Sequence, residues 1–209
     1  MGPNVFVSRH PLVLDRLATL RDVQTPPARF RAAVRQLSHL LFVEASADLL
    51  TDTLTVRTPL ADCPAHRLAQ RIGVVPILRA GLGMADALLE LVPEARVWHL
   101  GLYRDHETLQ PVTYYNKLPP QVNVDVAFIV DPMLATGGSA VAAVGILRRW
   151  GCARIKFLGL IAAPEGVRAL SAAHPEVPIH LVAIDSHLNE CGYIVPGLGD
   201  AGDRQFDTV

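Results

Sequence analysis

Short apolar runs alternate with helix-like segments from Ile72 onward, and this alternation limits the folds that the chain can adopt. The runs are rich in Val, Ile and Leu, whereas apolar residues recur every three to four positions in the segments between them. Strands that are apolar on both faces must be covered by helices on both faces. We therefore predict an α/β fold with a mainly parallel sheet flanked by helices. The predicted strands are 72–78, 96–103, 124–131, 154–163 and 179–185, and the predicted helices between them are 80–92, 139–151 and 164–175.

An N-terminal helical segment precedes this alternation. Apolar residues at helical spacing predict helices over 12–23 and 27–50. The chain has 209 residues, of which 50% are hydrophobic, and it is long enough to form one sizeable core. We expect a single domain over 1–209, with its core sheet and helices at about 72–185.

Charge, hydropathy and cysteine usage exclude several classes of protein. The chain has 19 basic and 20 acidic residues, so no overall positive field attracts nucleic acid. Its longest apolar runs are far shorter than the roughly 20 residues that cross a bilayer, and its first residues lack the apolar core of a secretion signal. Cys63, Cys152 and Cys191 are odd in number and form no CxxC pair, which argues against disulfides and structural zinc. We expect a cytoplasmic protein with no membrane or nucleic-acid partner.

The segment DPMLATGGS, residues 131–139, joins one apolar strand to a helix. Gly137 and Gly138 allow the backbone to approach a ligand closely, and the free amides and positive dipole end of the following helix favour a phosphate. The alternative is an ordinary turn in which Thr136 or Ser139 only caps the helix. The lysine of a P-loop and the GxGxxG fingerprint of dinucleotide sites are both absent from this segment.

Two charged residues at strand ends extend this prediction. Asp131 follows the apolar run VAFIV, and its carboxylate can accept hydrogen bonds from vicinal hydroxyls a few ångströms from a bound phosphate. A carboxylate beside a phosphate site therefore predicts a ribose 5-phosphate. Arg79 follows another predicted strand and precedes a glycine-rich helix start, where a guanidinium can bind pyrophosphate. The alternative for Arg79 is a surface salt bridge.

The segment VDPMLATGGS resembles the binding motif for phosphoribosyl pyrophosphate (PRPP) of the type I phosphoribosyltransferases, although Pro132 replaces the second of the two acidic residues usual there. This variant is similar to the uracil phosphoribosyltransferase family. Four further segments share the similarity, which runs from about His10 to nearly the end of the chain. They are VVPILRAGLGM (74–84), YRDHETLQP (103–111), AAPEG (162–166) and GYIVPGLGDAGDR (192–204).

The resemblance implies a type I phosphoribosyltransferase fold and a reaction that transfers the phosphoribosyl group from PRPP to N1 of uracil, giving UMP and pyrophosphate. It implies an oxocarbenium-like transition state, no covalent nucleophile, and Mg²⁺ held mainly by PRPP rather than by protein ligands. It also implies a homo-oligomer (dimer or tetramer) and, in some members of the family, activation by GTP. Two alternative functions stay open: a related enzyme for purines or orotate, and an RNA-binding regulator with the same fold. The uracil-type tail argues against the first, and the near-zero net charge argues against the second.

The same resemblance assigns site residues. Those expected at PRPP are Arg79, Arg104, Asp131, Pro132, Met133, Leu134, Ala135, Thr136, Gly137, Gly138, Ser139 and Asp200. Those expected at uracil are Ile194, Gly199, Asp200 and Ala201, with Asp131 and Asp200 as the candidate catalytic residues.

Two segments lie outside the strand and helix pattern. The long connection 104–123 predicts either a surface hairpin or a functional flap. The glycine-rich tail 186–209 is expected to contain the uracil-binding loop. Two residues depart from the family pattern: Val43 stands where Tyr is usual, and Asp207 stands where Gly is common.

Overall fold

A computed structural model describes residues 2–104 and 111–208. Its helices are α1 (Pro11–Arg21), α2 (Pro27–Ala45), α3 (Leu82–Leu91), α4 (Gly138–Trp150), α5 (Pro164–Ala173) and α6 (Ala201–Phe206). Its strands are β1 (Val5–Val7), β2 (Thr51–Arg57), β3 (Asp62–Leu68), β4 (Ile72–Leu78), β5 (Arg96–Val97), β6 (Leu100–Arg104), β7 (Pro111–Asn116), β8 (Val126–Val130), β9 (Met133–Leu134), β10 (Ile155–Ala162), β11 (Ile179–Ile184), β12 (His187–Leu188) and β13 (Ile194–Val195).

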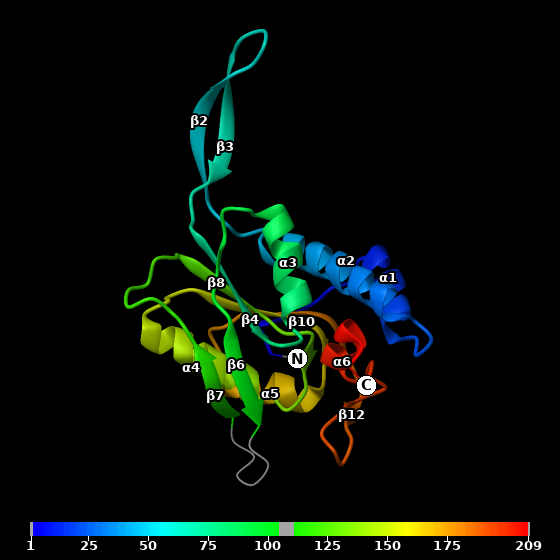
Figure 1. The fold of residues 1–209 in the computed structure, drawn as a ribbon. Helices are drawn as coiled ribbons and strands as arrows, with labels where there is room; N and C mark the ends of the chain where they lie inside the picture. Colours follow the sequence, from blue (N-terminus) through cyan, green and yellow to red (C-terminus); the bar gives the residue numbers. More distant parts are fainter. Residues whose placement is uncertain (1, 105–110, 209) are drawn as a thin grey trace.

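The main sheet has the strand order β1-β11-β10-β8-β4-β6-β7, with β5 beside β4 and β9 beside β10 (Figure 1). Its paired strands run parallel except β7, which is antiparallel to β6. The predicted α/β fold is confirmed, and the predicted strand over 96–103 is divided into β5 and β6.

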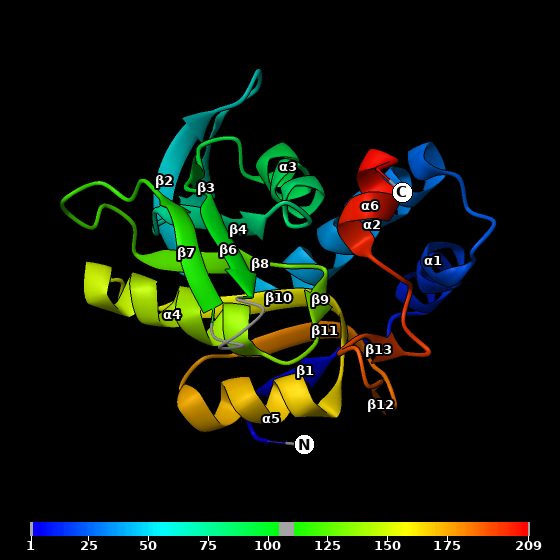
Figure 2. The same ribbon diagram turned by 60° about the horizontal axis from the view of Figure 1, so that its bottom comes forward.

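Helices cover both faces of this sheet, as its continuous apolar strands require (Figure 2). Val74 and Phe128 belong to the core beneath α1, α2 and α3. Their chain neighbours Val75 and Ile129 belong to the core beneath α4 and α5, because successive side chains of a strand point to opposite faces. The two helical layers therefore bury alternate residues of the same strands.

The direction of chain connection reverses at β4. From β4 the chain passes through α3 to β6 on one side, and it then returns to β8 on the other side of β4. Because α3 and α4 pack on opposite faces of the sheet, the chain leaves the carboxyl ends of β4 and β8 towards opposite faces, the arrangement that forms a ligand crevice in open α/β sheets. Ligands of open α/β sheets bind at such points. Arg79 and Asp131, each the first residue after one of these strands, both lie at this edge.

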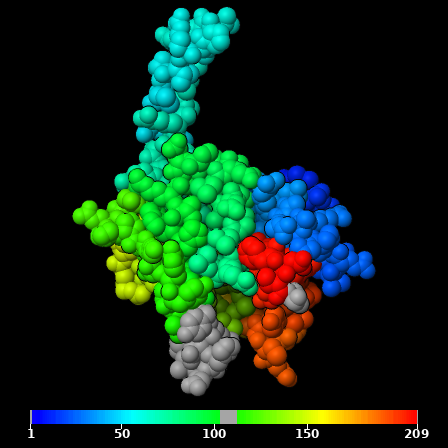
Figure 3. Space-filling view, in the orientation of Figure 1, coloured from blue at the N-terminus to red at the C-terminus, as the bar shows by residue number. Residues whose placement is uncertain are grey.

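A separate antiparallel hairpin of β2 and β3 extends away from the sheet and helices (Figures 1 and 3). Most residues of both strands are exposed, and the apolar face is small: Leu54 and Val56 of β2 pair with Ala65 and Cys63 of β3. The prediction of a helix over 27–50 was therefore too long: α2 ends at Ala45, and β2 begins at Thr51.

The connection 104–123 begins as a hairpin, because β7 pairs with β6. Residues 105–110, at the centre of the predicted flap, lie outside the described part of the chain. The tail contains the short β12–β13 pair and then α6, which packs beside α2 (Figure 3). After α6, Asp207 has a φ of 56°, a left-handed conformation in which Gly is the favoured residue. Val43 is 61% exposed, so the loss of the usual Tyr changes no buried packing. None of the helices in the described residues is long and apolar enough to cross a membrane.

Acid should destabilise the fold through His180, a buried residue of β11 whose ring stacks on Phe6 at 4.9 Å. Burial and the positive charge of Lys156 lower the pKa of His180 from 6.5 to about 4. Below pH 6.5 the unfolded chain takes up a proton that the folded chain does not, so the free energy of unfolding falls as pH drops towards 4. The loss from this residue should be about 2 kcal/mol between pH 7 and pH 4.5. Urea unfolding at both pH values measures it, and His180→Gln should show a correspondingly smaller loss; an equal loss would contradict the assignment.

Candidate active site

Arg79 lies in the tight turn between β4 and α3. A Cβ atom on Gly81 of this turn would lie 2.5 Å from the carbonyl oxygen of Val130, so the turn packs directly against the end of β8. The Arg79 side chain is more than half exposed, with its guanidinium 3.4 Å from the Asp203 carboxylate and 5.9 Å from the centre of the Phe206 ring. Arg79 is therefore held at the crevice by two residues of α6 and remains accessible to a ligand.

Asp131 lies at the neighbouring strand end, and its Oδ1 accepts a hydrogen bond from the Met133 amide at 3.1 Å. Burial raises the pKa of Asp131 to about 7; the Met133 bond opposes the rise, and the charge of Asp200 adds to it. The charge of Asp200 contributes to this rise, so the two predicted catalytic residues lie within electrostatic range of each other, although they are 69 residues apart in sequence (200 − 131).

Residues 135–139 form a tight loop from β9 into α4. Gly137 has a φ of 86°, which few other residues adopt, and it directly precedes the first residue of the helix. A small cavity of about 80 Å³ is lined by Asp131, Met133, Leu134, Ala135, Thr136, Gly137, Ser139 and Ala140. The predicted phosphate loop, its glycines and the preceding carboxylate thus surround one cavity at a helix N-terminus.

The residues before this loop hold it in place and bring no polar side chain to it. They are Pro132, Met133 and Leu134. The Pro132 carbonyl accepts hydrogen bonds from the amides of Leu160 and Ile161 in β10, and the Leu134 carbonyl accepts one from Ala163. The side chains of Pro132 and Leu134 are buried. Proline at the second motif position therefore replaces a carboxylate with an apolar contact and leaves Asp131 as the acidic residue of this loop.

The AAPEG segment packs directly against the predicted phosphate loop. Gly166, in the first turn of α5, is so close to the loop that a Cβ atom there would lie 2.5 Å from the Leu134 carbonyl oxygen and closer still to that of Ala135. Gly137 in turn lies against the Gly166 backbone and the Ala169 side chain. The loop is thus packed against α5 without room for an additional methyl group.

The expected uracil segment is held by an ion pair that was not predicted. Both guanidinium nitrogens of Arg21 donate to the buried carboxylate of Asp185, at the end of β11. The same carboxylate accepts the Gly197 amide at 2.9 Å, and Arg21 also donates to the Gly197 carbonyl at 2.7 Å. The turn between Ile194 and Gly199 is therefore fixed to both α1 and the sheet.

The four residues expected at uracil occupy this segment and the start of α6. Ile194 is buried in β13, Gly199 is exposed with a φ of 80°, and Ala201 is fully buried. The Asp200 side chain caps α6 by accepting the Asp203 amide at 2.9 Å. Asp203 of α6 contacts Arg79, and the charge of Asp200 acts on Asp131, so the start of α6 lies near the ends of both β4 and β8.

Replacing Asp185 with Asn should loosen this segment. The amide offers a single acceptor oxygen to three N–H groups and turns its own donor towards one of them, so the KM for uracil should rise about tenfold while the KM for PRPP changes less than about twofold. Steady-state kinetics measure both constants. Asp125→Asn is a matched control, because Asp125 makes a similar bidentate pair with Arg71 on the surface, away from the crevice; equal effects of the two variants would contradict the assigned role.

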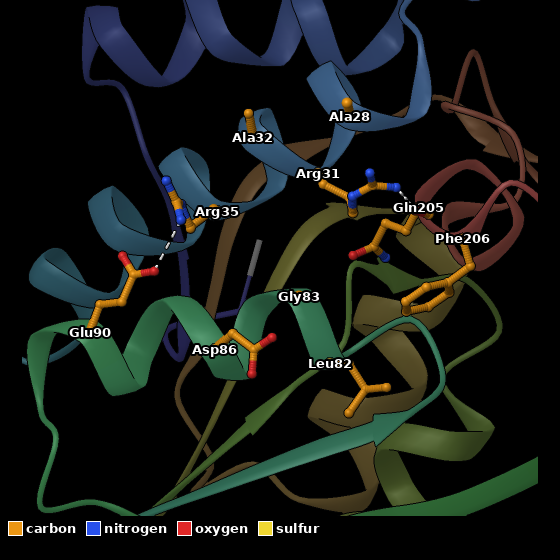
Figure 4. Close-up of a pocket in the computed structure, with 10 residues that line it drawn as sticks. All are labelled: Ala28, Arg31, Ala32, Arg35, Leu82, Gly83, Asp86, Glu90, Gln205 and Phe206. Carbon is orange, nitrogen blue, oxygen red and sulfur yellow. Dashed lines mark hydrogen bonds and ion pairs between the residues drawn. The ribbon is translucent and has the colours of Figure 1, made fainter.

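Two further observations concern Arg104 and a second cavity. Arg104 is the last residue of β6, but its side chain lies outside the described part of the structure. A cavity of about 590 Å³ lies away from the crevice, between α2, α3 and α6 (Figure 4). Arg21, Asp185 and Gln205 were not predicted, and Gly166 lay in the AAPEG segment without an assigned role. Asp185 had a usable signal, because it follows an apolar strand as Asp131 does.

A mainly parallel sheet covered by helices on both faces, with a glycine-rich loop and a carboxylate after β8 and an arginine after β4, is the arrangement that the resemblance to the type I phosphoribosyltransferases predicts. The family model for uracil phosphoribosyltransferase matches residues 7–208. The uracil phosphoribosyltransferase of Roseiflexus castenholzii is 66% identical over 98% of each chain, and that of a Thermoanaerobacter species is 50% identical over 100% of each. The solved structure of the AQ2163 protein from Aquifex aeolicus is 36% identical, covers 98% of each chain and superposes with a TM-score of 0.91. The chain belongs to the uracil phosphoribosyltransferase family, as its motifs predicted.

Proposed function

We propose that this uracil phosphoribosyltransferase binds PRPP across the carboxyl ends of β4 and β8. The free amides of 135–139 would hold the 5-phosphate at the start of α4. Asp131 would accept hydrogen bonds from the ribose hydroxyls, and Arg79 would bind the pyrophosphate, with Arg104 as its predicted second partner. The single observation that carries this proposal is that the loop and Asp131 line one cavity at the end of β8, while Arg79 is the first residue after β4, the parallel strand paired with β8.

Uracil would bind against the segment from Ile194 to Ala201. Backbone donors and acceptors of a rigid turn suit a pyrimidine, whose carbonyl and imide groups alternate along its edge. The hydrogen bonds of Arg21 and Asp185 to Gly197 supply that rigidity. Asp200 belongs to this segment and its charge acts on Asp131, so it is suited to orient uracil or to face the metal.

In this arrangement the chain acts by position and charge. N1 of uracil forms a bond to C1 of the ribose as the bond from C1 to pyrophosphate breaks; the electron pair of that bond leaves with the pyrophosphate, and the proton of N1 is released to solvent. Arg79 stabilises the charge that develops on the leaving group, while Asp131 holds the ribose in line between the two. Such interactions contribute several kcal/mol in a preorganised site.

Mg²⁺ fits the chemistry of this crevice. Asp131 and Asp200 place two carboxylates at one edge, and their mutual repulsion contributes to the raised pKa of Asp131. Mg²⁺ prefers oxygen ligands and commonly binds phosphates with one or two carboxylates. We place it chiefly on PRPP oxygens, with these carboxylates nearest; when bound, it would neutralise charge on the pyrophosphate.

We propose that residues 1–209 act as one domain, with the uracil site in 186–209. An assay with PRPP, Mg²⁺ and a panel of bases tests the proposed function. UMP and pyrophosphate should form with uracil, and no nucleotide should form with hypoxanthine, adenine or orotate. Nucleotide formation with a purine or orotate would overturn the assignment of the uracil segment.

We further propose that the chain forms a homo-oligomer through the β2–β3 hairpin. An isolated two-stranded ribbon has little stability of its own, and this one exposes Leu60 and Leu68. Packing against a second copy would cover these side chains. Light scattering should give at least twice the 22.6 kDa of one chain, and replacing 52–67 by a short turn should give the single mass. An oligomer that survives this change would show that another surface forms the interface.

Activation by GTP is proposed from the family resemblance. Addition of GTP at subsaturating PRPP should raise the rate of UMP formation, and an unchanged rate over a range of GTP concentrations would exclude it.

A further inference from the structure

Gln205, a residue of α6, is the only polar side chain of that helix that is almost wholly buried, with an exposed fraction of 1% among the residues described. Its amide nitrogen donates to the carbonyl of Ala80 at 2.9 Å and to the carbonyl of Ala201 at 3.1 Å. Both of its N–H groups therefore have acceptors, and these acceptors lie 121 residues apart in sequence (201 − 80).

The two acceptors belong to different substrate segments of the proposed site. Ala80 directly follows Arg79 in the turn expected to bind pyrophosphate, and Ala201 is the last residue of the segment expected to bind uracil. One amide group thus joins the backbones of both. Buried hydrogen bonds of this kind strongly resist separation, because each carbonyl would otherwise lose its partner away from water.

The surroundings of Gln205 hold it in this position. In Figure 4 its side chain extends from α6 towards the first turn of α3, beside Gly83. A Cβ atom on Gly83 would overlap the Gln205 Oε1, so only Gly at that position leaves space for the amide. On the other side, Arg31 of α2 donates to the backbone carbonyl of Gln205 at 2.7 Å.

Further contacts of α6 point to the same connection. Asp203 and Phe206 contact the Arg79 guanidinium, and Arg204 donates to the Leu198 carbonyl at 2.8 Å. A shift of α6 when uracil binds would therefore move both the side chain of Arg79 and the backbone beside it. The rigid α6 is the element through which the two subsites can influence each other.

We infer that Gln205 is a positioning residue that couples the uracil and pyrophosphate subsites, so that occupancy of one strengthens binding at the other. This inference rests on the proposed function, because it takes the residues of the two subsites from it. Gln205 itself contacts neither ligand. It fixes the distance between Ala80 and Ala201. A ligand that orders one of these two segments therefore also orders the other segment.

The test uses uracil and Mg²⁺-pyrophosphate, a pair that cannot react together. Calorimetry of uracil binding to the full chain, without and with saturating Mg²⁺-pyrophosphate, gives the coupling factor. We expect about a tenfold increase in affinity for the unsubstituted chain. Gln205→Met keeps the side-chain volume and removes both donors, so its coupling factor should fall below about twofold. No coupling in the unsubstituted chain, or equal coupling in Gln205→Met, would overturn the inference.

Three variants make the test independent of a general loss of stability. Gln205→Asn keeps an amide that is one carbon too short to reach Ala80, and Gly83→Ala displaces the Gln205 amide by steric overlap; both should reproduce the loss of coupling. Gln70→Met makes the same chemical change at a residue that accepts the Leu50 amide away from the crevice, and it should keep the coupling. Formation of UMP by the unsubstituted chain is measured in parallel, so that a failure of the proposed function is distinguished from a failure of coupling alone.

Discussion

Replacing Gly166 with Ala should reduce kcat/KM for PRPP by about 100-fold, although Gly166 contacts no substrate in the proposed site. The added methyl group would lie 2.5 Å from the Leu134 carbonyl oxygen and closer to that of Ala135, and neither backbone group can rotate away. The phosphate loop must therefore shift by roughly 1 Å relative to Asp131 and Arg79, and a displacement of that size in a positioned substrate costs about two orders of magnitude in rate. Initial rates at varied PRPP measure the loss.

The separate kinetic constants identify the cause of this effect. The atoms nearest to an added Cβ on Gly166 belong to Leu134 and Ala135, so the KM for uracil should change less than about threefold. Gly145→Ala is the matched control, since Gly145 lies within α4 and the nearest atom to an added Cβ is the end of the Arg149 side chain at 3.4 Å. That variant should keep full activity and gain roughly 0.5–1 kcal/mol in stability from helix propensity. Full activity in Gly166→Ala would show that the loop can move without cost.

The sequence predicted the sheet well because each of its central strands is buried on both faces. The run VAFIV in β8 has no polar residue, and such a continuous apolar run is typical of a strand buried in a parallel sheet. The β2–β3 hairpin was missed because most of its residues are exposed and its alternation is short: only Leu54 and Val56 in β2 face Ala65 and Cys63 in β3. The short β12 and β13 were missed because two-residue strands carry no periodicity at all.

For the candidate site, the sequence predicted the residues but not what holds them. Asp131 and the glycines of 135–139 could be recognised because they follow one another in the chain. The contacts that fix them join distant positions: Gly166 lies under the phosphate loop, Asp185 binds Arg21, and Gln205 connects Ala80 with Ala201. Such pairings depend on how helices pack on the sheet, and no local pattern reports them.

Replacing Asp131 with Asn should lower kcat/KM for PRPP by about 100-fold while leaving the fold intact. The asparagine offers a neutral acceptor where a carboxylate would accept bonds from two ribose hydroxyls, and charged hydrogen bonds contribute roughly 1.5–3 kcal/mol. The variant should also be more stable than the parent at pH 8. Burial raises the pKa of Asp131 from 3.8 to about 7. Between about pH 4 and pH 7 this residue ionises in the unfolded chain while it stays protonated in the folded chain, so the free energy of unfolding falls as pH rises through that range. Thermal unfolding at pH 8 should therefore give a higher Tm for Asp131→Asn.

The pH dependence separates the role of Asp131 from that of the substrate. With a pKa of about 7, the carboxylate is mostly protonated at pH 6 and mostly ionised at pH 8, so the KM for PRPP should fall up to roughly tenfold across that range. The phosphates of PRPP titrate in the same range, but they do so equally with either protein. The ratio of the parent and Asp131→Asn constants therefore isolates the carboxylate, and it should grow as pH rises. A ratio that stays constant from pH 6 to pH 8, or kinetic constants that do not change on substitution, would remove Asp131 from the ribose and leave the phosphate loop and Arg79 as the residues that bind PRPP.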